Sequence, residues 1–136
     1  MRNESLAFDY LKRARSRIRA IEVLMEERSW ADVVRESQEA VEILLKGLLR
    51  FHLIDAPQVH DVSPVLDANR DRLSSMPAGE LDELIRISRN LRRDRELAFY
   101  GSEDLTPSEF YTHADADSAL ASARKVLEVV AGSLGQ

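Results

Sequence analysis

Residues 30–49 read WADVVRESQEAVEILLKGLL, and this stretch decides the fold. Its apolar and small residues recur at the three- and four-residue spacing of one helix face: Trp30, Val33, Val34, Ser37, Ala40, Val41, Leu44, Leu45, Leu48 and Leu49. A stripe this wide predicts a helix at the centre of the core, running from Trp30 to about Leu53 with Ser29 as its N-cap. Gly47 costs this helix roughly 1 kcal/mol relative to Ala, so we expect a close helix–helix contact there.

Helical periodicity continues on both sides of this segment, and no alternating run of strand type interrupts it. Further helices are expected over residues 5–28, 63–74, 79–100 and 115–132. Ser63 and Pro64 are typical of a helix start, while 102–114 reads as a loop. The sequence therefore predicts an all-α protein, an antiparallel four- to five-helix bundle formed by a single domain over residues 1–136.

The composition excludes several classes of function. The chain has 136 residues, of which 44% are hydrophobic and 32% charged, and it contains no cysteine. Disulfide scaffolds, thiolate zinc sites and cysteine nucleophiles are thereby removed. No segment has the ~20 apolar residues of a membrane span or the apolar region of a signal peptide, so we expect a cytoplasmic protein without membrane contact.

The three histidines show no metal-ligand pattern. None of His52, His60 and His113 follows a Glu by three residues, and they lie in different segments. We therefore expect no metal and no cofactor. A half-buried position at a helix end is the expected place of His52.

The most informative polar segment is LIRISRNLRRDRELAFYG, residues 84–101. Five arginines against one aspartate lie between residues 86 and 95. On a helix Arg86, Arg89 and Arg93 form one row, because residues three and four apart are neighbours. Guanidinium groups in a row suit phosphate oxygens, and an aromatic side chain beside them can stack on a base. The candidate nucleotide- or RNA-binding residues are Arg89, Arg92, Arg93, Arg95 and Tyr100. Pairing of these arginines with nearby acidic groups is the alternative.

Three stretches together resemble the HEPN domain family over nearly the whole chain. They are SQEAVEILLKGLL (37–49), HDVSPVL (60–66), and RRDRELAFYG (92–101) followed by Tyr111, Thr112 and a last helix, DADSALASARKVLEVV (115–130). The resemblance implies a helical bundle that usually dimerises. Many members are ribonuclease toxins or defence effectors, others are partners of a minimal nucleotidyltransferase, and some only bind nucleotides.

The ribonuclease members of that family carry Arg, then four to six residues, then His on the fourth helix. Arg93 matches the Arg, and Tyr100 matches a Tyr that often follows the His. The His position falls on Ala98, which can move no proton. The resemblance therefore implies a degenerate motif, with no catalytic residue other than Arg93 if the protein is active.

Three hypotheses remain open at the level of the sequence. The first is a dimeric module that binds nucleotide or RNA and a partner such as a nucleotidyltransferase, as in toxin–antitoxin pairs. The second is a metal-independent endoribonuclease toxin in which His113, in the predicted loop, or Tyr100 replaces the missing His. The third is a protein-interaction module without a ligand. For the dimer, an aromatic surface is expected from Phe8, Phe99, Phe110 and Tyr111.

Overall fold

A computed structural model describes the backbone of residues 2–100 and 106–136, and the side chains of residues 4–91 and 106–136. The described residues form six helices and no strand: α1 (Arg2–Glu26), α2 (Trp30–Phe51), α3 (Ser63–Ala68), α4 (Ala78–Tyr100), α5 (Pro107–Phe110) and α6 (His113–Ser133). The predicted all-α class is confirmed.

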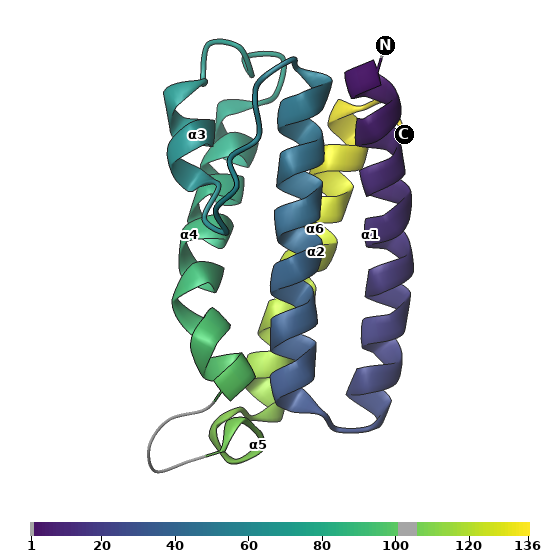
Figure 1. The fold of residues 1–136 in the computed structure, drawn as a ribbon, viewed down its shortest axis with the longest axis vertical. Coiled ribbons are helices and arrows are strands. Elements are labelled where there is room, and N and C mark those ends of the chain that lie inside the picture. The colour runs from purple at the N-terminus through teal and green to yellow at the C-terminus, as the bar shows by residue number, and fades with distance from the viewer. Residues whose placement is uncertain (1, 101–105) are drawn as a thin grey trace.

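The four long helices α1, α2, α4 and α6 lie side by side, each running opposite to the one before it (Figure 1). Helix α2 contacts all three of the others, while α3 packs on α4. Helices α1 and α4 stand on opposite sides of the bundle (Figure 1). The central place predicted for the 30–49 segment is therefore confirmed.

Burial explains why α2 occupies the centre. Its apolar stripe is almost fully removed from solvent, with Leu45, Leu48 and Leu49 at 0% exposure. A Cβ atom added at Gly47 would lie 3.2 Å from the Cβ of Tyr10 in α1. The close contact expected at Gly47 is thus present, and it lets the backbones of α1 and α2 approach each other.

Helices α1 and α2 both end through a residue in the left-handed conformation. Arg28 has φ 58° and Leu53 has φ 60°, and in each case the next amide returns to the carbonyl five residues back. This is the Schellman geometry, in which glycine is the usual residue. It ends α2 at Phe51 rather than at Leu53.

The short third helix differs from the expectation. It ends at Ala68 and not near residue 74, and Val62 rather than Ser63 is its N-cap. The Oδ1 atom of Asp61 accepts hydrogen bonds from the backbone nitrogen and the hydroxyl of Ser63, at 3.0 and 2.6 Å. Asp61 therefore provides the side-chain acceptor at the start of α3, which the sequence suggested would come from Ser63.

The expected loop over 102–114 contains helix α5 and the start of α6. Two capping boxes explain both helix starts: Thr106 with Glu109 at α5, and Thr112 with Asp115 at α6. Helix α6 begins at His113, so the expectation of a loop position for His113 is wrong.

Candidate functional site

Polar contacts fix the rotation of α4 against the rest of the bundle. The Gln38 amide donates to the backbone oxygen of Leu91 at 2.8 Å. The backbone nitrogen of Val62 donates to the hydroxyl of Ser88 at 3.1 Å, and that hydroxyl lies 3.3 Å from Oδ1 of Asp61. Because Ser88 faces inward, Arg86 and Arg89 lie on the outer surface of the helix.

Both of the arginines whose side chains are described on α4 are exposed. Arg86 lies 3.2 Å from Glu83, an exposed ion pair that contributes little to stability. Arg89 has no hydrogen-bond or ion-pair partner in the part of the chain that the structure describes. Among the described residues, nothing therefore competes with an external anion for this cation of the predicted row.

The remaining predicted site residues belong to the last turns of α4. Arg92, Arg93, Arg95 and Tyr100 lie on this helix, which extends to Tyr100 as expected. Their side chains, and that of Ala98, lie outside the described residues. The helical backbone supports the spacing of the row, and the roles of these side chains stay predictions.

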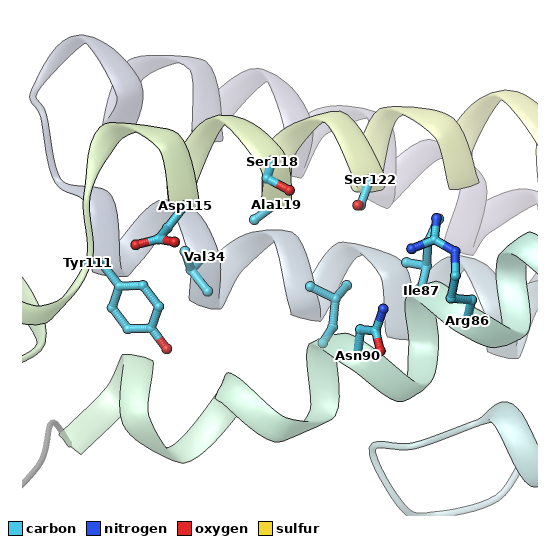
Figure 2. A pocket seen from close by; sticks show the side chains of 10 residues that line it. Val34, Arg86, Ile87, Asn90, Tyr111, Asp115, Ser118, Ala119 and Ser122 are labelled. Atoms are coloured by element: carbon cyan, nitrogen blue, oxygen red, sulfur yellow. The ribbon is translucent and has the colours of Figure 1, made fainter.

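A pocket of about 160 Å³ lies between α4 and α6, and Arg86 is the described arginine of the row that lines it (Figure 2). The residues that line it are Val34, Arg86, Ile87, Asn90, Leu91, Tyr111, Asp115, Ser118, Ala119 and Ser122. Its volume is that of roughly five water molecules and below the ~300 Å³ at which pockets for whole ligands begin. The pocket can therefore take one chemical group, such as a base edge or a sugar, while a larger ligand would extend over the outer face of α4.

The charges of this pocket are mixed. Arg86 and Asn90 enter it from α4, and Asp115 enters from α6 (Figure 2). The Oδ2 atom of Asp115 already accepts from the backbone nitrogen and the hydroxyl of Thr112, at 2.9 and 3.0 Å. A carboxylate in the wall disfavours a phosphate and favours a group that donates hydrogen bonds.

The apolar side of the pocket belongs to a small hydrophobic cluster near the start of α2. Its buried members are Ala31, Val34, Tyr111 and Ala119, and Trp30 packs against them. The His113 ring meets the Trp30 ring edge-on, with 5.0 Å between ring centroids. Because Trp30 is the only tryptophan of the chain, its fluorescence can report on this pocket.

A second group of polar residues joins α2 to the loop before α3. Oε1 of Glu42 lies 2.7 Å from Nδ1 of His60, and Oε2 lies 2.9 Å from Nζ of Lys46. Sequence reasoning did not bring these three residues together. The i,i+4 spacing of Glu42 and Lys46 was a usable signal for that pair, but nothing local pointed to His60, 18 positions away.

The other two histidines have separate surroundings. His52 is partly buried at the C-terminus of α2, as expected. Burial lowers its pKa, and the neighbouring guanidinium of Arg72 lowers it further. No group of three or more potential metal ligands occurs among the described residues. None of the described helices combines the length and the hydrophobicity that a membrane-spanning segment needs.

The aromatic surface expected for a dimer is only partly present. Tyr111 is 5% exposed and belongs to the core, so its assignment to the surface is wrong. Phe8 is partly buried and lies against Phe51, whereas Phe110 is 40% exposed. Phe99 lies outside the residues whose side chains are described.

Comparison with known proteins identifies one family. The family model described as HEPN domain matches residues 7–133, nearly the whole chain. No curated protein and no solved structure gives a significant match.

Proposed function

Because the chain belongs to the HEPN domain family, we propose that it is a homodimeric module that binds a nucleotide or RNA through the outer face of α4. The observation that carries the proposal is Arg89, a basic side chain that is exposed and without a partner among the described residues. Family membership supports a role connected with nucleotides or RNA. The proposed binding residues are Arg89, Arg92, Arg93, Arg95 and Tyr100.

The proposed division of labour follows from charge and volume. Phosphate groups lie along the exposed arginines, because planar guanidinium groups can hold phosphate oxygens bidentately. A base or sugar occupies the pocket between α4 and α6, whose volume of about 160 Å³ and mixed charge suit one polar group. Tyr100 stacks on a further base.

The homodimer and the partner are inferred from the family. HEPN domains commonly dimerise, and a pocket too small for a whole nucleotide is consistent with a site completed by a second copy. A minimal nucleotidyltransferase is the proposed partner, as in toxin–antitoxin pairs. We place this assembly in the cytoplasm.

The proposal is for binding without cleavage. Residue 98 is Ala where the resemblance expects His, and an alanine can neither take nor give a proton. We therefore expect the purified protein not to cut RNA when no metal is added. An Arg93→Ala variant purified in parallel reveals any contaminating nuclease. Cleavage by the wild type that this variant lacks would instead favour the endoribonuclease.

In the binding experiment, ATP, GTP or short single-stranded RNA is titrated into the protein. Calorimetry and Trp30 fluorescence monitor the binding. Arg89→Ala is expected to weaken binding about tenfold, which corresponds to the ~1.4 kcal/mol of a charge-assisted contact. The matched control is Arg19→Ala, which removes an exposed arginine on α1, across the bundle from α4. Equal losses of affinity in Arg89→Ala and Arg19→Ala would show that binding depends on the net charge of the protein and not on Arg89. No binding at millimolar ligand would refute the proposal and leave the protein-interaction module.

A further inference from the structure

The cluster of Glu42, Lys46 and His60 differs from an ordinary surface ion pair. One carboxylate holds two basic groups, each of its oxygens serving one of them, at 2.7 Å from His60 and 2.9 Å from Lys46. The side chains of Glu42 and Lys46 are only 16% and 19% exposed, whereas that of His60 is 54% exposed. The imidazole is thus the solvent-facing end of a partly buried group.

The Glu42 carboxylate determines which ring nitrogen of His60 can gain or lose a proton. An ionised carboxylate only accepts hydrogen bonds, so Nδ1 of His60 carries a hydrogen and donates it to Glu42. Protonation then takes place at Nε2, for which the described residues supply no partner. On protonation, Nε2 changes from a hydrogen-bond acceptor to a charged donor directed away from Glu42.

Lys46 determines the charge that results. It already neutralises Glu42, so protonation of His60 gives the three residues a net charge of +1. Without Lys46, a protonated His60 would only balance the carboxylate. The other acidic groups nearby are Glu39, one turn earlier on α2, and Asp61, and both already have interaction partners.

The loop that carries His60 is attached to α4 beside Arg89. Asp61 and Val62 both meet the hydroxyl of Ser88, the residue before Arg89. Successive helical residues are about 100° apart, so Ile87 and Arg89 flank Ser88 on opposite sides. Ile87 lines the pocket against α6 and Arg89 does not, which places Arg89 on the side away from α6. His60 thus belongs to a loop that meets α4 at Ser88, the residue before Arg89.

We propose that His60, held by Glu42 and Lys46, is a proton-dependent subsite for a phosphodiester group of single-stranded RNA. The inference rests on the proposed function, since Arg89 supplies the contact that does not depend on pH. When Nε2 is protonated, it donates a charged hydrogen bond to a phosphate oxygen; when it is neutral, this donor is absent. RNA affinity therefore rises as the pH falls through the range in which His60 gains its proton.

The test uses an oligouridylate of about six nucleotides without terminal phosphates, because the charge of a phosphodiester does not change near neutral pH. Calorimetry compares its affinity for the full chain at about pH 5.5 and about pH 7.5, a range in which imidazole is the side chain that changes charge. We expect binding to be up to about tenfold tighter at the lower pH. In His60→Gln, which keeps an amide donor for Glu42 but no titrating charge, we expect that gain to disappear.

Two further variants separate this subsite from a general effect of acid. His113→Gln removes an exposed imidazole on α6 and should retain the full gain. Lys46→Gln makes the cluster one charge more negative whether His60 is neutral or protonated, so RNA affinity should fall at both pH values while the gain at the lower pH remains. Circular dichroism at both pH values checks that each variant is folded.

The outcomes distinguish this subsite from the proposed function. A pH dependence unchanged in His60→Gln, or lost equally in His113→Gln, overturns the subsite and leaves RNA binding by Arg89 intact. An affinity that Arg89→Ala lowers at both pH values while its pH dependence persists supports both assignments. Absence of RNA binding by the wild type at either pH overturns both.

Discussion

Helices α2 and α4 are almost equally long, at 22 and 23 residues, but they use their surfaces differently. Helix α2 buries twelve of its residues and touches every other long helix. The described part of α4 buries Leu81, Leu84, Ile85, Ile87 and Ser88. It leaves Arg86 and Arg89 exposed. The comparison teaches that α2 stabilises the fold by burial, whereas α4 is held partly by polar contacts and leaves two arginines exposed to solvent.

The largest effect is expected from the buried face of α2. Leu45→Ala removes a side chain with 0% exposure, and the cavity and the lost burial together should destabilise the protein by about 2–5 kcal/mol. Urea unfolding measures this loss. A loss below about 1 kcal/mol would mean that α2 does not dominate the core.

The polar contacts that attach α4 to the loop before α3 should contribute less to stability than the buried face of α2. Ser88→Ala leaves the buried backbone nitrogen of Val62 without its acceptor and takes a contact from Asp61. We expect a destabilisation of about 1–3 kcal/mol, the cost of a buried unsatisfied polar group. Hydrogen exchange should rise at residues 60–63 more than in α1. Uniform exchange throughout the chain would contradict a local attachment.

A pair of glycine substitutions compares the two helices directly. An alanine at Gly79, near the start of α4, meets nothing within 4 Å and should stabilise the protein by about 0.4–1 kcal/mol. An alanine at Gly47 meets the Cβ of Tyr10 at 3.2 Å, close to the backbone of α1. The crowding should cancel or exceed the gain in helix propensity of roughly 1 kcal/mol. Thermal unfolding of both variants tests this, and equal stabilisation would show that α1 can move away.

The smallest effect concerns the end of α2. The pKa of His52 is lowered from 6.5, so the unfolded chain binds this proton more tightly than the folded one. The stability that the folded protein gains from holding His52 neutral is complete above pH 6.5. It is lost as the pH falls through the window between 6.5 and the lowered pKa. His52→Gln should flatten the fall in stability on acidification relative to the wild type. Parallel urea midpoints of the two proteins from pH 7.5 to about pH 5 would contradict this assignment.

Local patterns predicted most of the fold. Periodicity identified α1, α2, α4 and α6 because each has an apolar stripe, and their ends were misplaced by a few residues. Helix α5 was missed because it has no buried residue and depends on the capping box of Thr106 and Glu109. At the start of α3 the side-chain acceptor is Asp61 rather than Ser63, because one Asp61 oxygen serves both donors of Ser63, which spacing does not reveal.

The candidate site was predicted less completely. The arginine row lies within ten residues of one helix, so the sequence was sufficient to propose Arg89 and its neighbours. The pocket unites Val34 of α2 with residues of α4 and α6, and its position depends on how those helices pack. Tyr111 was expected at the surface and is buried, because the segment between α5 and α6 turns it toward Val34 and Ala119.

The sequence by itself determined the helical class, the central place of α2 and the concentration of positive charge on α4, because each follows from residues close together along the chain. Only the tertiary structure decided that Glu42 and His60 meet, that Ser88 is buried against the loop before α3, and that Arg89 is left without a partner among the described residues. These features depend on contacts between distant segments, and burial and charge balance are settled only when the helices pack together.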